Sequence, residues 1–197
     1  AIAYSLAYCV HTLEMSPVRG WGVAFLGFVA LGAGVNDAAV TPAVVMTTIG
    51  LIGTAASIAG NEAAIPIGRR KLIGLAMLAS IAFAASIGFV GATSYAIAVG
   101  MLALYGLVIW LDSASLTAGA AGTAEPSRRG ATLAVHSTLG YAGGFVGPLI
   151  VGYMLDIAGG MSRMSWGLAF LCVGLLNLLV LATFWRINPR GLAGDKS

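Results

Sequence analysis

The chain is 197 residues long, and 59% of its residues are hydrophobic while only 9% are charged. A mean hydropathy of +0.95 predicts a protein embedded in a membrane rather than a water-soluble domain. The net charge of +3 is small and is spread over short connections between apolar segments, so we attribute it to membrane topology and expect no nucleic-acid partner.

Six apolar segments are each long enough to cross a hydrocarbon core of about 30 Å, which takes roughly 20 helical residues. An open sheet could not satisfy its backbone in lipid, so all six are predicted to be helices. They cover about residues 1–33, 42–60, 72–91, 95–120, 131–157 and 164–185. A polar tail over residues 189–197 follows, and we expect it to be mobile. The predicted fold class is an all-α membrane protein with six transmembrane helices.

The first segment carries a stripe of polar side chains near its middle. Tyr8, His11 and Glu14 are three residues apart and share one helix face, which Tyr4 extends by a turn. An ionisable group at the centre of a membrane helix costs about 2.5 to 3.5 kcal/mol and is rarely kept without a role or a partner. We therefore expect the stripe to face the bundle interior and to contribute to substrate binding or proton handling.

Pro17 and Arg19 follow this stripe. Pro17 deprives the Leu13 carbonyl of its helical donor, which predicts a kink, and broken helices beside polar side chains are typical of transporter sites. Arg19 is a further candidate for the site, because a kink could turn it toward Glu14. The alternative is that Glu14 and Arg19 neutralise each other or face the outer interface, and that His11 is a hydrogen-bonded histidine of the bundle.

The second segment begins at Thr41 and Pro42, a predicted N-cap and first helical residue. It ends in a charged stretch, residues 60–71 (GNEAAIPIGRRK), which we place in the cytoplasm because basic residues favour that side. Eight of the ten Lys and Arg residues fall on the same side: Arg69, Arg70, Lys71, Arg128, Arg129, Arg186, Arg190 and Lys196. The opposite connections carry Asn36 with Asp37, the uncharged residues 92–94, and Asp156 with Arg163. Both chain ends are therefore predicted to be cytoplasmic.

The fourth segment contains Asp112 next to Ser113. At 1.5 Å per residue, Asp112 lies in the cytoplasmic half of the membrane, where we expect it to pair with His136 of the fifth segment. A structural latch is the first interpretation of this pair, and ion coupling or substrate contact is the alternative.

The fifth segment contains the pattern G-x-x-x-G-P-x-x-x-G, formed by Gly143, Gly147, Pro148 and Gly152. Small residues four apart let helix backbones approach closely, and Pro148 allows a bend. The pattern predicts a tight helix-packing motif.

Three further features of the sequence concern the cysteines, two tryptophans and the start of the chain. Cys9 and Cys172 both lie in apolar segments, so neither a disulfide nor a metal site is expected. Trp166 and Trp185 lie near opposite ends of the sixth segment, in positions typical of membrane interfaces, and are predicted to be interface or packing aromatics. The chain starts at Ala1 inside an apolar stretch without a basic n-region, so we expect a further segment to precede it.

Residues 60–71 resemble the cytoplasmic loop signature of the major facilitator superfamily (MFS), G-x-x-x-D-x-x-G-R-R/K. The residues that match are Gly60 at the start and Gly68, Arg69, Arg70 and Lys71 at the end. Ala64 stands where the signature has Asp, and one extra residue separates the glycines. The acidic role, which in the family is to latch one conformation, is therefore assigned to Glu62.

Further resemblances extend over nearly the whole chain. The glycine pattern is similar to a motif on the fifth helix of MFS antiporters, and residues 7–28 resemble the seventh helix of a bacterial subgroup. The segments LDSASLTAG (111–119) and RRGATLAVHSTLGYAGGFVGP (128–148) add to this similarity. The resemblance implies the C-terminal half of such a protein, helices seven to twelve, built as two inverted three-helix repeats.

This resemblance implies a secondary active transporter of a small solute in a bacterial inner membrane, working by alternating access, with residues 60–71 as a gate. Its partners would be the lipid bilayer, an N-terminal six-helix half on the same or a separate chain, an unidentified small-molecule substrate and, if the cycle is proton-coupled, protons. The alternative is a non-transporting MFS-like scaffold or accessory subunit of a larger membrane complex. Neither a metalloprotease pair nor a phosphate-binding loop is present in the sequence, so no enzyme activity and no cofactor are expected.

Overall fold

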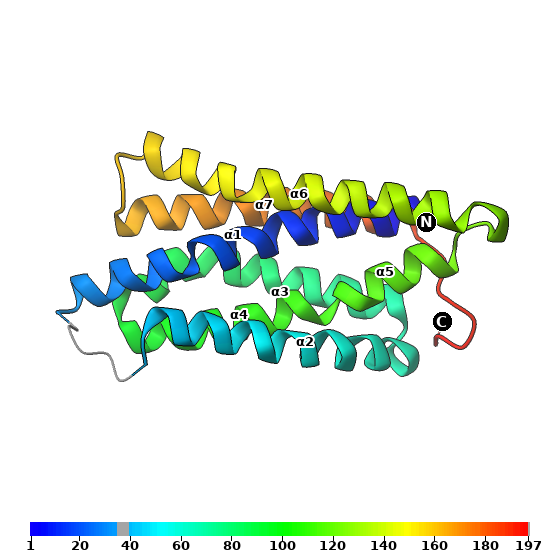
Figure 1. Ribbon diagram of the computed structural model, residues 1–197, viewed down its shortest axis with the longest axis horizontal. Helices are drawn as coiled ribbons and strands as arrows, with labels where there is room; N and C mark the ends of the chain where they lie inside the picture. The colour runs from blue at the N-terminus through cyan, green and yellow to red at the C-terminus, as the bar shows by residue number, and fades with distance from the viewer. Residues whose placement is uncertain (35–39, 197) are drawn as a thin grey trace.

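The computed structural model describes residues 1–34 and 40–196, and within these ranges the chain is helical apart from short connections, with no strand. The helices are α1 (Ile2–Gly32), α2 (Pro42–Ile67), α3 (Arg69–Val90), α4 (Tyr95–Leu111), α5 (Ser113–Gly122), α6 (Arg129–Ile157) and α7 (Arg163–Ile187), as drawn in Figure 1. Two short 3₁₀ helices, η1 (Gly91–Thr93) and η2 (Pro126–Arg128), precede α4 and α6.

The described residues form six helical spans that are long and apolar enough to cross a membrane, with α4 and α5 together making one span. The prediction of an all-α protein with six such helices is confirmed. Figure 1 shows both chain termini at the same end of the bundle, which also holds the basic residues that follow α2, α5 and α7. We call this the basic end. Asn36 and Asp37, expected in an opposite connection, lie outside the described residues.

The charged stretch at residues 60–71 differs from the loop that the sequence predicts. Helix α2 continues to Ile67 and α3 begins at Arg69, so only Gly68 separates them. Gly68 has a φ of +93°, a conformation that side chains with a Cβ rarely adopt, which explains why a glycine makes this one-residue turn. The hydropathy of the sequence falls after residue 60 because α2 extends past its apolar segment. The backbone nevertheless stays helical up to Ile67.

The span predicted over residues 95–120 is interrupted in the structure. Helix α4 ends at Leu111 and α5 begins at Ser113, with Asp112 between them at φ −94° and ψ −11°. By contrast, α1 is assigned as one helix through Pro17, where the sequence predicts a kink. The helix break therefore falls at Asp112, whose own side chain is a buried ionisable group.

Helix α1 packs closely along α6, and the glycines of α6 make this approach possible. A Cβ at Gly143 would overlap the Cys9 carbonyl, and a Cβ at Gly147 would overlap the Leu13 carbonyl. Near the far end of the contact, Trp21 donates a hydrogen bond from Nε1 to the Pro148 carbonyl at 3.0 Å and lies against Gly152. The glycine pattern thus lies in the α1–α6 interface.

The core at the end of the bundle opposite the basic end is aromatic. Trp166 is fully buried, and its ring centroid lies 5.2 Å from that of Phe25 and 5.8 Å from that of Phe170. Of the two interpretations of Trp166, an interface or a packing aromatic, the structure supports packing, because α7 turns this side chain toward α1. Trp185, at the basic end of α7, remains 45% exposed.

Candidate functional site

His11 and Asp112 form a close polar pair in the interior of the bundle. His11 Nδ1 lies 2.8 Å from Asp112 Oδ1, and both side chains are at most 5% exposed. The break between α4 and α5 brings Asp112 to this place, and the Ser57 hydroxyl of α2 accepts a hydrogen bond from the Ala114 amide just beyond the break. Three helical spans therefore meet at Asp112.

His136 does not pair with Asp112, in contrast to the prediction. Its Nδ1 lies 3.2 Å from the Ser5 hydroxyl and its Nε2 lies 3.3 Å from the Thr117 hydroxyl. The Tyr8 ring stacks on His136 with ring centroids 4.1 Å apart, and it also stacks on His11. Asp112 instead faces His11 of α1.

Glu14 is 2% exposed and lies one helical turn from His11 on α1. The Tyr105 hydroxyl donates a hydrogen bond to one carboxyl oxygen at 2.7 Å, and Asn177 Nδ2 donates to the other at 2.8 Å. Asn177 Nδ2 also donates to Ser80 Oγ at 2.9 Å. No basic side chain of the described residues forms an ion pair with Glu14. The carboxyl group is held by uncharged donors alone.

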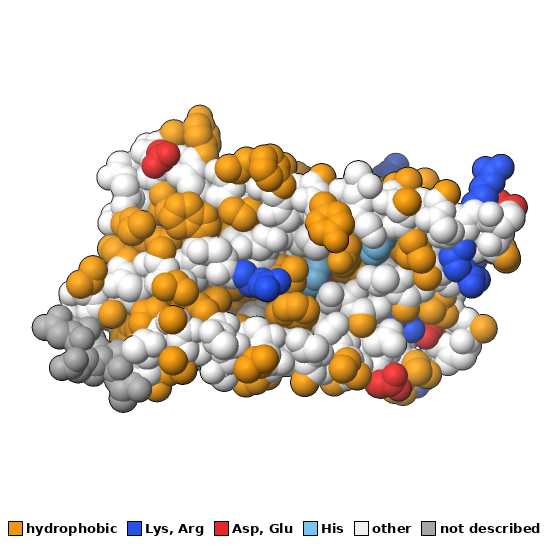
Figure 2. Space-filling view, viewed as in Figure 1, with side chains coloured by type: hydrophobic (Ala, Val, Ile, Leu, Met, Phe, Trp, Pro, Cys, Tyr) orange, Lys and Arg blue, Asp and Glu red, His pale blue; other side chains and the backbone are white. Residues whose placement is uncertain are grey.

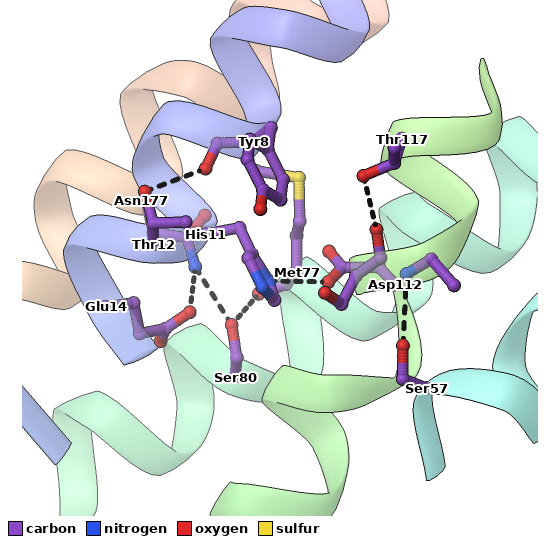
Figure 3. Close-up of polar contacts among 12 residues, drawn as sticks. Tyr8, His11, Thr12, Glu14, Ser57, Met77, Ser80, Asp112, Thr117 and Asn177 are labelled. Atoms are coloured by element: carbon purple, nitrogen blue, oxygen red, sulfur yellow. Dashed lines mark hydrogen bonds and ion pairs between the residues drawn. The ribbon is translucent and has the colours of Figure 1, made fainter. Parts of the chain in front are cut away.

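These contacts join four spans and form what we call the buried network: His11, Glu14, Ser80, Tyr105, Asp112 and Asn177. Figure 3 shows all of its members except Tyr105. Sequence reasoning missed Ser80, Tyr105 and Asn177. Asn177 was recognisable, because an amide in the middle of an apolar membrane span needs a partner. Tyr105 gave no comparable signal, since a tyrosine among apolar residues is usually a packing aromatic.

The buried network is closed to water in this conformation. The void bordered by His11, Glu14, Met77, Asp112 and Asn177 leaves no room for a water-sized sphere. Apart from Asp112 Oδ1, which contacts only His11 Nδ1, two buried atoms in it, His11 Nε2 and Asn177 Oδ1, have no hydrogen-bond partner among the described residues. Buried polar atoms without a partner are rare in folded proteins, so these two are a distinctive feature of the network.

The predicted stripe is buried except at Tyr8, which is half-buried. Tyr4 is buried and donates a hydrogen bond from its hydroxyl to the Arg190 carbonyl at 2.7 Å. Tyr8 and the exposed Arg19, which follows the stripe, both border a surface formed by α1, α2 and α6 that we call the outer face. Arg19 is exposed and forms no ion pair with the buried Glu14, so the expected approach of these two side chains does not occur.

Two grooves of about 450 Å³ each meet at Arg19 on the outer face. One runs between α1 and α6 and includes Tyr8, Ser16 and Tyr141. The other runs between α1, α2 and α4. Figure 2 shows a single basic patch in the middle of this face, surrounded by apolar side chains and well away from the basic end.

Arg69 is buried at the basic end and is held by the tail, residues 189–196. Its Nε and Nη2 lie 3.0 and 3.2 Å from the two Asp195 carboxyl oxygens, and Nη1 donates to Asn61 Oδ1 at 2.8 Å. Glu62, expected to provide the acidic partner, is exposed and faces away. The sequence prediction failed here because Asp195 is 126 residues from Arg69.

The tail itself is ordered against the α2–α3 turn. The Lys196 amide donates to the Ile65 carbonyl at 2.8 Å, and the Lys196 carbonyl lies against Gly68. Arg70 bonds to the Asn188 side chain. The tail, which the sequence predicts to be mobile, is docked in this structure by contacts with α1, α2 and α3.

The titratable side chains of the described residues do not gather as metal ligands. Among the described residues, no group of three His, Cys, Asp or Glu side chains could hold a metal ion. No family model matches the chain, and a search of curated proteins found no match. The features of the described residues that bear on function are the buried network, the outer face and the basic end.

Proposed function

We propose that the chain is one six-helix half of a secondary active transporter of the MFS type, and that Glu14 carries a proton during its cycle. The observation that carries this proposal is the Glu14 carboxyl, buried among uncharged donors and one turn from the His11–Asp112 pair. A buried carboxylate without a counter-charge is costly, and taking up a proton removes that cost. Any movement that changes its donors would therefore change its proton occupancy.

The packing pattern supports an MFS-like half built from two related three-helix units. If the two units are related repeats, α1 corresponds to α4, α2 to α6 and α3 to α7. The contact between α1 and α6 in one arrangement then corresponds to the contact between α4 and α2. Likewise, the contact between α3 and α4 corresponds to that between α7 and α1, and the contact between α3 and α7 corresponds to itself. All of these contacts are present, as inverted repeats require.

The outer face is the surface that we assign to the substrate pathway and to the second half. It carries Arg19, Tyr8 and Ser16 along grooves, together with the exposed aromatic side chains of Tyr141 and Phe145. An exposed arginine in the middle of a membrane helix is unfavourable against lipid and becomes favourable against water or an anionic group. Arg19 would thus contact substrate or solvent, while Glu14 acts from behind it.

The basic end is assigned to the cytoplasm by the excess of Lys and Arg there. Under this assignment, the Arg69–Asp195 pair lies at the cytoplasmic mouth. It would hold the α2–α3 turn and the tail together in one conformation and release them in another.

A second candidate function is a non-transporting scaffold, and the closure of the buried network favours it. Because the void around Glu14 holds no water, the network can also be explained as a polar staple that joins four spans. A scaffold would have its outer face sealed by partner helices, whereas a transporter exposes that face to water during its cycle.

Thiol accessibility of the outer face separates these two functions. We suggest introducing Ser16→Cys and Ser137→Cys, one at a time, into the protein in its native membrane, with Cys9 and Cys172 changed to Ser. A transporter predicts that both positions react with a membrane-impermeant maleimide, because both line the α1–α6 groove. The matched control is Leu179→Cys, on the exposed outer surface of α7, which should stay unreactive in lipid. Equal protection of all three positions would favour the scaffold.

A further inference from the structure

A groove of about 780 Å³ opens at the basic end between α3, α7 and the tail. One wall is the tail itself, which is fixed there by the Arg69–Asp195 pair. The groove is therefore part of the fold, and its shape depends on tail docking. It lies at the opposite end of α3 and α7 from the aromatic core and is separate from the buried network and the outer face.

The rim of this groove carries an excess of positive charge. Arg70, Lys71, Arg190 and Lys196 line it, and all four are exposed. The only carboxylate in the lining, Asp195, already accepts hydrogen bonds from the Arg69 guanidinium at both of its oxygens. Four cations therefore surround the groove without an acidic partner in its lining, a distribution that favours an anion with several acceptor oxygens.

The inner wall of the same groove is apolar. Leu75, Leu78 and Trp185 line it and are 53%, 41% and 45% exposed. Leu78 follows Arg70 by eight residues, which is about 12 Å along α3 toward the membrane centre. Gly74 leaves the space that the Trp185 ring occupies, since a Cβ there would lie 2.8 Å from Trp185 Nε1. The groove thus runs from a basic rim to a lipid-facing apolar wall.

We propose that this groove binds a phospholipid with an anionic headgroup. The phosphate would lie among Arg70, Lys71, Arg190 and Lys196, and an acyl chain would run along Leu75, Leu78 and Trp185. A free phosphate could use the rim but would gain nothing from the apolar wall, so the wall selects a lipid. Basic pockets at the ends of membrane helices recognise anionic lipids by this combination of charge and apolar surface. Because the tail forms one wall, a bound lipid would also stabilise the docked tail.

Lipid retention by the purified protein tests this site. We suggest native mass spectrometry in a zwitterionic detergent with added dioctanoyl phosphatidylglycerol, and in parallel with dioctanoyl phosphatidylcholine, glycerophosphoglycerol or inorganic phosphate. We expect saturable binding of the phosphatidylglycerol, at least about tenfold tighter than that of the phosphatidylcholine. The two soluble phosphates should bind at least about tenfold more weakly than the anionic lipid.

Two double variants locate the binding. Lys71→Gln with Arg190→Gln removes two exposed cations of the groove while leaving the Tyr4–Arg190 backbone contact in place. Arg129→Gln with Arg186→Gln is the matched control, since it removes two exposed cations from the same end outside the groove. We expect the groove variant to weaken phosphatidylglycerol binding at least about tenfold and the control to change it less than about threefold.

Three results would overturn the proposal. One is equal binding of both lipids, and another is an equal loss in the two double variants. The third is binding of glycerophosphoglycerol or phosphate as tight as that of the lipid, which would identify a site for a soluble anion. Both variants keep all hydrogen bonds described for the tail, and an unchanged unfolding midpoint without lipid will verify that they fold.

Discussion

At the scale of single residues, the most consequential contact is the His11–Asp112 pair at 2.8 Å. Its two side chains come from different spans and neither reaches water, so each satisfies the other. Sequence reasoning identified both residues as candidates from their charge inside apolar segments. It could not pair them, because the break at Asp112 turns this residue toward α1 and away from His136.

Removing His11 should destabilise the protein strongly. His11→Leu leaves the Asp112 carboxylate buried without its partner, and breaking one side of a buried pair costs about 3 to 5 kcal/mol. Denaturation of the protein in mixed micelles, followed by circular dichroism, measures the free energy of unfolding. The control is Asp156→Asn, an exposed change expected to stay within about 0.5 kcal/mol. A His11→Leu loss as small as that of the control would mean that the pair contributes nothing.

Glu14→Gln should be tolerated much better than His11→Leu. The Tyr105 hydroxyl can donate to the glutamine oxygen, and a flipped Asn177 amide can offer its free Oδ1 to the new NH₂ group. We expect a loss below about 1.5 kcal/mol in the same denaturation measurement. A loss of the His11→Leu size would show that the network requires the carboxyl itself.

At the scale of elements, some boundaries followed from sequence and others did not. Thr41 caps α2 as predicted, accepting a hydrogen bond from the Val44 amide. The break between α4 and α5 could not be predicted, because Asp112 is followed by Ser and Ala rather than by Gly or Pro. The docked tail could not be predicted either, since its contacts join residues more than one hundred positions apart.

Asp195→Asn should release the tail. The change removes the charge that holds the Arg69 guanidinium, which remains buried beside Asn61 and the Ser115 carbonyl. We expect the amides of Leu192, Asp195 and Lys196 to exchange with deuterium at least about tenfold faster, since loss of about 1.4 kcal/mol gives that factor. Asp156→Asn is again the control. Unchanged exchange at these amides in Asp195→Asn would show that the ion pair does not fix the tail.

Gly147→Val should disrupt the contact between α1 and α6. The new side chain would overlap the Leu13 carbonyl, which is backbone and cannot move aside cheaply. Overpacking of this kind costs about 1 to 3 kcal/mol and lowers the thermal unfolding midpoint. Gly130→Ala, on the same helix with nothing within 4 Å of the added methyl group, should leave the midpoint unchanged. A midpoint equal to that of Gly130→Ala would contradict the close packing described here.

At the scale of the whole molecule, hydropathy alone was enough to predict the number of spans and their helical structure. The six apolar segments all became helical spans, because a membrane leaves the backbone few other ways to satisfy its hydrogen bonds. Which apolar faces of the helices are exposed could not be predicted, since most exposed and buried residues alike are apolar or small. Glu14 of the predicted stripe is buried and Arg19, which follows the stripe, is exposed, because the rotation of α1 within the bundle turns them to different sides.

The orientation that we predict for the whole molecule places the basic end in the cytoplasm. In a protein with Cys9 and Cys172 changed to Ser, Ser127→Cys at the basic end should react with an impermeant maleimide only after the cytoplasmic side is opened. Met161→Cys, exposed at the other end, should react in intact cells. The opposite pattern would reverse the assignment made from the basic residues.

The central claim is that Glu14 exchanges a proton inside the bundle, and infrared difference spectroscopy of the reconstituted protein tests it without a known substrate. The claim predicts a protonated-carboxyl band whose intensity changes with pH and disappears in Glu14→Gln. Glu62→Gln, a matched change at an exposed carboxyl, should leave that band in place. If Glu14→Gln and the unmodified protein give the same spectra at every pH, Glu14 carries no proton and the buried network is only a staple between helices.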